Sequence, residues 1–189
     1  MKIYVMRHGE SVNNADNRLT GWADVALTER GVEQARLAGM KMRDVKFDAV
    51  FASDLMRARV TCETALPGCE YTLDSRLREM CLGEYENKRR DEIAGIFSEE
   101  VRAAVANGGY SAVGGENYEE FLLRIRSFID YLADKPYETV AVVAHAGVVR
   151  SFFDLTFGVK CFGRVSNPNC VIAVFNLNDG KLTLDAWNI

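Results

Sequence analysis

Ile3-Tyr4-Val5-Met6, followed by Arg7-His8-Gly9-Glu10, forms an apolar strand pattern that ends directly in a charged loop. The chain contains 2 histidines, and the second, His145, follows the apolar stretch 139–144 in the same way. Because ligands of open α/β sheets bind beyond the carboxyl ends of the strands, we expect both imidazoles to face one pocket. A histidine beside an arginine has the groups needed to attack a phosphoryl centre while the guanidinium holds its oxygens.

The composition limits the classes of protein that this chain can represent. Its 189 residues carry a net charge of −4 and suffice for one domain, which we expect to span residues 1–189. No long basic run is present, so neither nucleic acid nor an anionic membrane is expected as a partner. The 5 cysteines include no Cys-x-x-Cys pair, and no basic segment followed by an apolar one precedes the first strand. These features predict reduced thiols and a cytoplasmic location.

The apolar residues follow an alternation of strands and helices. Strands are expected at 2–6, 48–52, near 71–73 and at 139–144, with a final hairpin of 171–177 and 181–187. Helices are expected over 28–42, 54–64, 91–107, 117–132 and 148–157. The buried face of the first helix is expected to carry Val32, Ala35, Ala38, Gly39 and Met42.

Helix-capping residues support these boundaries. Thr28 is a suitable N-cap, and Asn117 with Glu120 has the spacing of a capping box. Gly158 is placed to end the last helix. Strands that alternate with helices predict a three-layer α/β sandwich, in which helices flank a mostly parallel central sheet on both faces.

Six motifs occur in an order that indicates a family. They are Arg7-His8-Gly9-Glu10-Ser11 with Asn14, residues 17–22 continuing to 27–31, Ser53-Asp54-Leu55-Met56-Arg57-Ala58 with Thr61, Arg76-Leu77-Arg78-Glu79, Gly114-Gly115-Glu116, and His145-Ala146-Gly147-Val148-Val149-Arg150. Together they resemble the histidine phosphatase superfamily, the phosphoglycerate mutase-like proteins, over essentially the whole chain.

The resemblance implies a role for each catalytic residue. His8 would be the nucleophile that forms a phosphohistidine, with its other ring N–H held by a backbone carbonyl. Arg7 and Arg57 would clamp the phosphate oxygens, and His145 would donate to the same phosphate as an imidazolium held by that dianion. Glu79 would protonate the leaving oxygen and then help water to attack the phosphohistidine.

Further residues near these motifs are assigned more loosely. Asn14, Thr20, Gly21 and Ala146 are expected to contact the phosphate or the substrate, and Ala146 stands where many family members have glycine. Glu84, Glu86 and Glu116 lie in nearby loops and are alternatives to Glu79 as the acid. Arg18 and Arg150 are expected to be solvated or to form structural ion pairs.

No metal or other cofactor is expected. The 2 histidines are far apart in the sequence, and no Asp/Glu cluster has the spacing of a metal site. Arg and His side chains would neutralise the phosphate, so the activity is expected to survive chelators.

The superfamily contains both phosphatases and mutases. Cofactor-dependent mutases carry a long basic insertion after the acid motif, whereas the segment from Glu79 to Gly114 is short here and has one basic cluster, Lys88-Arg89-Arg90. We therefore expect a phosphatase of small phosphomonoesters, and the few cationic groups at the predicted mouth argue against polyphosphorylated substrates. A cofactor-dependent phosphoglycerate mutase, and a phosphoprotein phosphatase or phosphate-binding regulatory module, are the alternatives. No feature indicates the physiological substrate or the oligomeric state.

Overall fold

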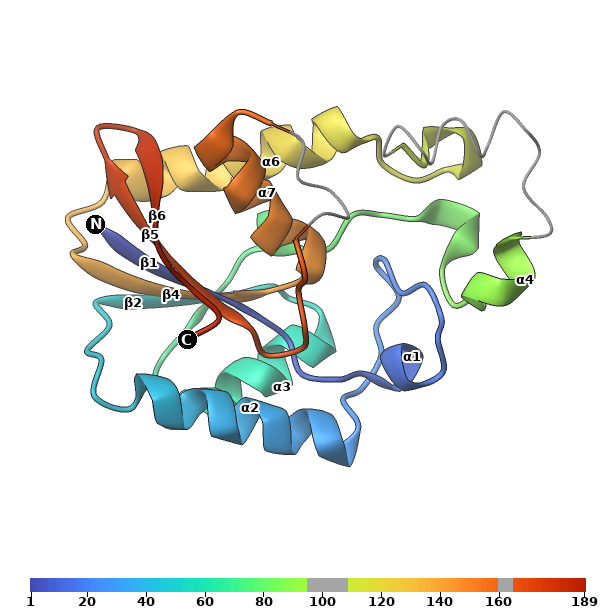
Figure 1. Cartoon of the computed structure of the whole chain (residues 1–189), viewed down its shortest axis with the longest axis horizontal. Coiled ribbons are helices and arrows are strands. Elements are labelled where there is room, and N and C mark those ends of the chain that lie inside the picture. Colours follow the sequence, from blue (N-terminus) through green and yellow to red (C-terminus); the bar gives the residue numbers. More distant parts are fainter. Residues whose placement is uncertain (95–108, 160–164) are drawn as a thin grey trace.

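The computed structural model describes residues 1–94, 109–159 and 165–189. Its centre is a 6-stranded sheet with the strand order β3-β2-β4-β1-β5-β6 (Figure 1). The strands are β1 (Lys2–Arg7), β2 (Ala49–Ala52), β3 (Thr72–Leu73), β4 (Thr139–Ala144), β5 (Ile172–Asn178) and β6 (Lys181–Trp187). β1, β2, β3 and β4 run parallel to one another, and β5 pairs antiparallel with both β1 and β6. The predicted mostly parallel sheet with a C-terminal hairpin is confirmed.

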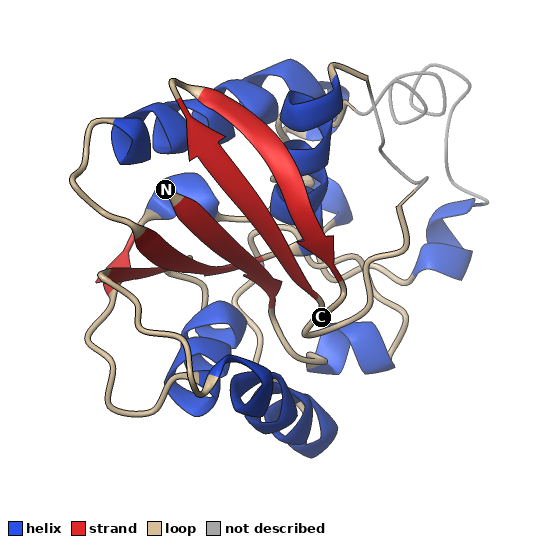
Figure 2. Ribbon diagram, turned by 60° about the vertical axis from the view of Figure 1, so that its left-hand side comes forward, coloured by secondary structure: helices blue, strands red, loops and turns tan. Residues whose placement is uncertain are grey.

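Helices cover both faces of the sheet (Figure 2). The described helices are α1 (Val12–Ala15), α2 (Glu29–Met42), α3 (Met56–Ala65), α4 (Arg90–Ala94), α6 (Tyr118–Ala133) and α7 (Ala146–Phe157), with short 3₁₀ turns at Ser75–Leu77, Gly83–Tyr85 and Ser111–Val113. α2 and α3 lie against one face, and α6 and α7 lie against the other. The three-layer α/β sandwich expected from the sequence is therefore confirmed.

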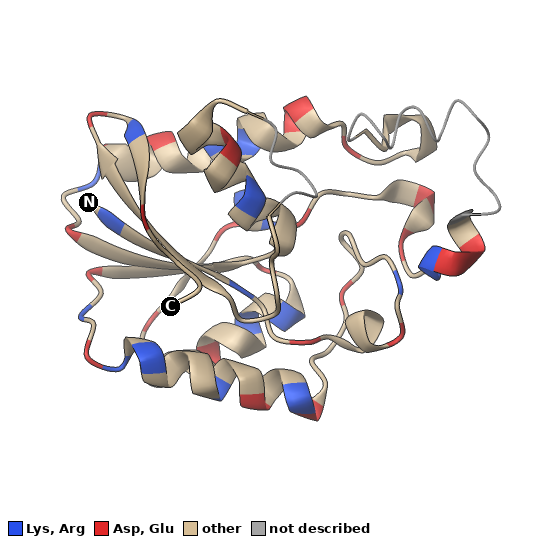
Figure 3. Cartoon of the chain, in the orientation of Figure 1, with Lys and Arg blue, Asp and Glu red and all other residues tan. Residues whose placement is uncertain are grey.

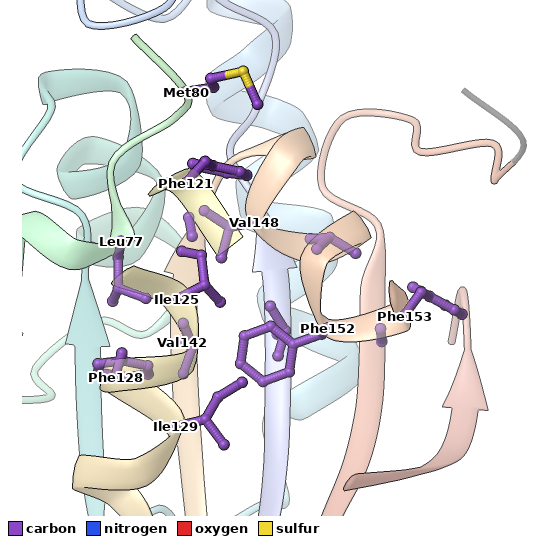
Figure 4. Packing of buried hydrophobic residues seen from close by; sticks show 14 of the residues in the cluster. Leu77, Met80, Phe121, Ile125, Phe128, Ile129, Val142, Val148, Phe152 and Phe153 are labelled. Carbon is purple, nitrogen blue, oxygen red and sulfur yellow. The ribbon is translucent and has the colours of Figure 1, made fainter. Parts of the chain in front are cut away.

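The two-residue period of the strands divides the core between these faces. In β4, Val140 and Val142 belong to the cluster beneath α6 and α7, whereas Ala141 and Val143 belong to the cluster beneath α2 and α3. Figure 4 shows how side chains from α6 and α7 fill the first cluster, with Met80 at one end of it. Because β4 is buried on both sides, its sequence is a continuous apolar run.

The predicted caps form, and they fix where three helices begin or end. The Thr28 side chain accepts the Gly31 N–H at 3.0 Å, and Asn117 with Glu120 makes both bonds of a capping box. α7 ends at Gly158, whose φ of +67° is the left-handed conformation that suits glycine.

Several sequence-based boundaries differ from the structure. α3 begins at Met56, two residues after its predicted start. α7 begins at Ala146, two residues before its predicted start, because His145 serves as its N-cap. Val32 is exposed, because Gly31 rather than Val32 faces inward in the first turn of α2. Of the helix expected over 91–107, α4 describes the first part, and the rest lies outside the described residues.

The cysteines that can be described are all unbridged. Cys62, Cys69, Cys81 and Cys170 are free thiols, and Cys161 lies outside the described residues. Burial raises the pKa of both Cys62 and Cys170 to about 12, which keeps these thiols protonated and unreactive.

Candidate active site

A pocket of about 190 Å³ lies beyond the carboxyl ends of β1 and β4. It is smaller than the roughly 300–1,000 Å³ typical of pockets for drug-sized ligands. The described residues that line it are Arg7, His8, Asn14, Leu19, Thr20, Gly21, Arg57, Glu79, Met80, Leu82, Arg90, Tyr110, Ala146, Gly147 and Arg150. Four of these are arginines and one is a carboxylate, so the pocket favours an anion. Figure 3 shows that the basic residues of this region come from different elements, including α3, α4 and α7.

His8 is held in one tautomer. Its Nδ1 lies 2.7 Å from the carbonyl oxygen of Gly9, which can only accept, so Nδ1 carries the proton and Nε2 keeps its lone pair. The backbone contact expected from the sequence is confirmed. Burial, with Arg57 and Arg7 nearby, lowers the pKa of His8 well below its usual value, so the ring is neutral at neutral pH. A neutral imidazole with a free nitrogen is the form that can attack phosphorus.

His145 lies beside His8, with ring centroids 5.2 Å apart. Its Nε2 is 2.8 Å from the hydroxyl oxygen of Ser53, and its buried Nδ1 has no hydrogen-bond partner among the described residues. Ser53 Oγ also accepts the Leu55 N–H at 3.4 Å, and its hydroxyl can either donate to Nε2 or accept from it. When Ser53 donates to Nε2, the His145 proton lies on Nδ1, which has no acceptor among the described residues.

The imidazolium expected at His145 is one that a phosphate dianion would hold. Burial, followed by the positive charge of Arg57, lowers the pKa of His145 well below its usual value. The imidazole is therefore neutral at neutral pH, and an imidazolium would require the charge of a bound phosphate. A neutral ring protonated on Nδ1 is already able to donate one hydrogen bond.

Arg57 is a fully buried cation of the pocket wall, and Arg7 is a partly buried one. The guanidinium of Arg57 donates to the carbonyl oxygens of Ala23 and Gly21, each at 2.8 Å, and Arg7 donates to that of Asn167. Burial lowers the pKa of each arginine to about 10, so both remain charged at neutral pH. The Nε atoms of both are buried and lack a partner among the described residues. Buried donors of this kind need an acceptor, which an anion would provide.

Glu79 is the glutamate that faces the pocket. Its Oε1 accepts the Met80 N–H at 2.9 Å and its Oε2 accepts the Gly147 N–H at 3.0 Å, which fixes the plane of the carboxylate. α7 begins directly after His145, and its second residue, Gly147, contacts the candidate acid.

The three alternative glutamates are engaged elsewhere or face solvent. Glu86 accepts the N–H groups of Trp22 and Leu82, and Glu116 accepts two bonds from Arg124. Glu84 is exposed. None of them is among the described lining residues, so the geometry favours Glu79 among these glutamates.

The loop that carries Glu79 is clamped by Arg124, which belongs to none of the six motifs, and by Trp22 from the motif 17–22. Arg124 on α6 donates to the carbonyl oxygens of Arg76, Arg78 and Glu79 at 2.7–2.8 Å, and it also pairs with Glu116. Trp22 adds a bond from its indole N–H to the Glu79 carbonyl oxygen at 2.7 Å. An arginine on an amphipathic helix gives no local sign of this role, because its partners are backbone atoms distant in the sequence.

The four residues expected to contact substrate, Asn14, Thr20, Gly21 and Ala146, all line the pocket. The Asn14 side-chain oxygen accepts from the Ser11 N–H and from Asn169, so its NH₂ group is the part left to donate to a ligand. Asn167 donates to the Ala146 carbonyl oxygen at 2.8 Å, and Asn169 donates to that of His8 at 3.1 Å. Neither asparagine belongs to a motif noted in the sequence, because both lie in the loop that precedes β5.

Two arginine assignments made from the sequence had different outcomes. Arg18 donates to the Asn87 carbonyl oxygen and pairs with Asp16 at 3.8 Å, as expected for a structural residue. Arg150, for which the same role was expected, lines the pocket, because the first turns of α7 follow His145 along the same edge. Arg90, a member of the basic cluster noted in the sequence, also lines the pocket, as does Tyr110, which had not been singled out. The expectation of few cationic groups at the mouth is therefore wrong.

The described part of the chain contains neither a candidate metal cluster nor a helix suited to a membrane. Its residues include no group of three or more His, Cys, Asp or Glu side chains arranged to hold a metal ion. Among the described helices, none has the length and apolar character needed to cross a membrane.

Comparisons with known proteins place this geometry in context. The model of the histidine phosphatase superfamily (branch 1) matches residues 3–189. A probable phosphoglycerate mutase, GpmB, from Erwinia tasmaniensis is 34% identical over 152 residues, which cover 78% of this chain and 70% of that protein. The crystal structure of a putative alpha-ribazole-5'-P phosphatase from Escherichia coli has a TM-score of 0.89 and 26% identity, covering 100% of this chain and 97% of the other. A mycobacterial glucosyl-3-phosphoglycerate phosphatase has the same fold, with a TM-score of 0.87 and 24% identity over 99% of this chain and 98% of that one.

Proposed function

The chain belongs to the histidine phosphatase superfamily, and from this premise we propose that it is a metal-independent phosphomonoesterase acting on a small phosphorylated metabolite. The observation that carries the proposal is the His8 tautomer, in which the Gly9 carbonyl oxygen holds the Nδ1 proton and leaves Nε2 as a nucleophile at the base of a cationic pocket. The phosphatases among the solved structures of similar fold support the same reaction class.

In the first step, the Nε2 lone pair of His8 attacks phosphorus and the P–O bond to the leaving group breaks. Arg7 and Arg57 hold the non-bridging oxygens, where negative charge is greatest during transfer. Their unpartnered Nε atoms and the Nδ1–H of His145 supply donors that are already desolvated. Glu79, in its protonated form, gives its proton to the departing oxygen, so the product leaves as an alcohol.

In the second step, the Glu79 carboxylate takes a proton from water as that water attacks phosphorus. The N–P bond breaks, inorganic phosphate is released and His8 returns to its neutral form. The bonds from Met80 and Gly147 hold Glu79 in one orientation for both steps. The positive charge that the phosphate requires comes from side chains of the chain itself.

Hydrolysis of p-nitrophenyl phosphate in excess EDTA tests this proposal, with wild type beside His8→Ala. Turnover by the wild type that is lost in the variant is expected. Arg89→Gln is a matched control for charge, because Arg89 pairs with Asp91 and is not among the lining residues. Turnover retained by a folded His8→Ala protein, or wild-type turnover abolished by EDTA, would refute the proposal.

A phosphoglycerate mutase is the second candidate, favoured by the name of the Erwinia relative and by the additional arginines in the pocket. Incubation with 3-phosphoglycerate and catalytic 2,3-bisphosphoglycerate separates the two. A mutase yields 2-phosphoglycerate, whereas a phosphatase releases inorganic phosphate. The small size of the pocket favours a metabolite over a phosphoprotein, and a phosphopeptide assayed in parallel tests that preference.

A further inference from the structure

One wall of the pocket is built on a short antiparallel ribbon, which joins two segments that are distant in the sequence. Residues 17–19 pair with residues 87–90 through backbone hydrogen bonds of 2.8, 2.9 and 3.0 Å, and Arg18 lies opposite Arg89 in this pairing. The first segment follows α1 and the second leads into α4, so the ribbon lies between these two helices (Figure 1).

The ribbon supplies part of the pocket lining. Leu19 and Arg90 belong to its two strands, and Thr20 and Gly21 follow directly on the first of them. In the proposed reaction, the phosphoryl group is transferred between residues that lie outside the ribbon. The ribbon is therefore available to the alcohol part of the ester, and its position relative to the catalytic residues should affect how tightly the ester binds.

A pair of asparagines joins the ribbon to α1, the short helix that carries Asn14. The side-chain NH₂ group of Asn13 donates to the side-chain oxygen of Asn87 at 2.8 Å. Asn13 is 5% exposed, so its amide is desolvated and loses an important partner if this bond is broken. Asn14 is the next residue in the chain and lines the pocket. The pair thus connects the ribbon to the part of α1 that faces the substrate.

Asn87 combines this side-chain bond with an uncommon backbone conformation. Its φ of +66° lies in the left-handed region, which glycine and asparagine tolerate better than most residues. Its N–H donates to the Leu19 carbonyl oxygen at 2.8 Å, and its carbonyl oxygen accepts from the Arg18 guanidinium at 2.7 Å. Glycine could keep this conformation and both backbone bonds, but it could not bond to Asn13. One substitution can therefore remove the side-chain bond without straining the backbone.

We propose that Asn13 and Asn87 are a pair of positioning residues, which hold the ribbon where its lining residues fit the alcohol part of the substrate. This inference rests on the proposed phosphatase function. Neither asparagine is among the described lining residues, so the pair acts through the ribbon. Contacts to the alcohol part are made equally in the bound ester and in the transition state, so weakening them raises KM and leaves kcat unchanged.

Asn87→Gly tests the pair, and folding is not threatened because Asn87 is exposed and glycine suits its φ. We expect KM for glycerol 3-phosphate and for p-nitrophenyl phosphate to rise about fivefold, with kcat changed by less than about twofold. The inhibition constant of inorganic phosphate, which has no alcohol part, should also change by less than about twofold.

Two further variants separate the side-chain bond from other effects of the substitution. Asn87→Asp should keep KM near the wild-type value, because its carboxylate still accepts from Asn13 and aspartate also tolerates a positive φ. Asn188→Gly is the matched control and should leave KM unchanged. Asn188 is also exposed, has a φ of +55° and is not among the lining residues.

A double-mutant cycle measures the coupling of the two asparagines. Asn13→Ala should raise KM by about as much as Asn87→Gly, because each removes the same bond. The double variant should therefore have a KM within about twofold of the larger single effect. If Asn13→Ala does not fold, the comparison of Asn87→Gly with Asn87→Asp still decides the question.

The outcomes separate this inference from the proposed function. An unchanged KM in Asn87→Gly, an equal rise in Asn87→Asp or in Asn188→Gly, or an equal rise in the phosphate inhibition constant would refute the positioning role, and the phosphatase proposal would stand. If wild type hydrolyses neither ester in excess EDTA, the proposed function has failed. Titration calorimetry with glycerol 3-phosphate then tests the pair without turnover. A Kd about fivefold higher in Asn87→Gly supports the role, whereas an equal Kd, or no binding to wild type, refutes it.

Discussion

Gly147→Ala is expected to impair catalysis by displacing Glu79. A Cβ atom at this position would lie 2.1 Å from Glu79 Oε1 and 3.0 Å from Phe121 Cζ. Ordinary contacts of a Cβ begin near 3.4 Å, so the carboxylate must shift by roughly 1 Å. The shift would also weaken the bond from the Gly147 N–H to Oε2, now 3.0 Å long. A displacement of this size at a reacting group costs about 10²-fold in rate.

The assay uses the dependence of a general acid on its leaving group. p-Nitrophenolate departs without being protonated, whereas the alkoxide of glycerol 3-phosphate must receive a proton. We therefore expect kcat/KM to fall by about 100-fold for glycerol 3-phosphate and by less than about 10-fold for p-nitrophenyl phosphate. kcat/KM is the relevant quantity because it covers the steps up to the first irreversible transfer to His8.

Gly39→Ala is the matched control. A Cβ at Gly39 would lie 2.2 Å from the carbonyl oxygen of Ala65, where α2 packs on α3, which is a comparable clash away from the pocket. This variant should lose thermal stability without a change in the ratio of the two kcat/KM values. An equal loss of kcat/KM on both substrates in Gly147→Ala, or the same change of ratio in Gly39→Ala, would refute the role assigned to Glu79.

Three further predictions concern orientation, pH and packing. Ser53→Ala removes the hydroxyl that holds His145 Nε2, so inhibition by inorganic phosphate should weaken by about tenfold with little change in melting temperature; unchanged inhibition would contradict this positioning role. Burial lowers the pKa of both His8 and His145 well below 6.5. Below about pH 6.5, the unfolded chain therefore binds protons at these two histidines, whereas the native chain leaves them neutral. The free energy of unfolding should therefore fall as the pH drops below about 6.5, by up to about 1.4 kcal/mol per pH unit for each histidine. A melting temperature that stays constant from about pH 7 to about pH 5 would contradict this. Phe128→Ala empties a fully buried position in the cluster of Figure 4 and should lower the free energy of unfolding by about 3–5 kcal/mol in urea denaturation, whereas a loss below about 1 kcal/mol would show that the site collapses around the gap.

Much of the fold could be predicted because its signals are local. The apolar run of β4 and the capping residues Thr28 and Asn117 specify elements without reference to the rest of the chain. The start of α7 was less accurate, because His145 serves as its N-cap and the Gly147 N–H bonds to Glu79, which is distant in the sequence.

The candidate site divides in the same way. The placement of His8 and His145 follows from the rule that strand ends converge, and the structure brings the rings to 5.2 Å. Arg124 and Ser53 contribute through contacts that form only after folding, the first with backbone carbonyls and the second with an imidazole. The place of Arg150 in the pocket lining also depends on the folded chain. Sequence patterns name the reacting groups, and tertiary contacts determine which residues hold them.

Trapping the covalent intermediate tests the central claim most directly. Wild-type protein is mixed with ³²P-labelled substrate, quenched in alkali within milliseconds and digested, and the labelled peptide is identified. The account predicts an acid-labile, alkali-stable phosphoramidate on the peptide that contains His8, and no label in His8→Ala. Label on another residue, or steady turnover with no labelled protein at any quench time and full activity in His8→Ala, would contradict it.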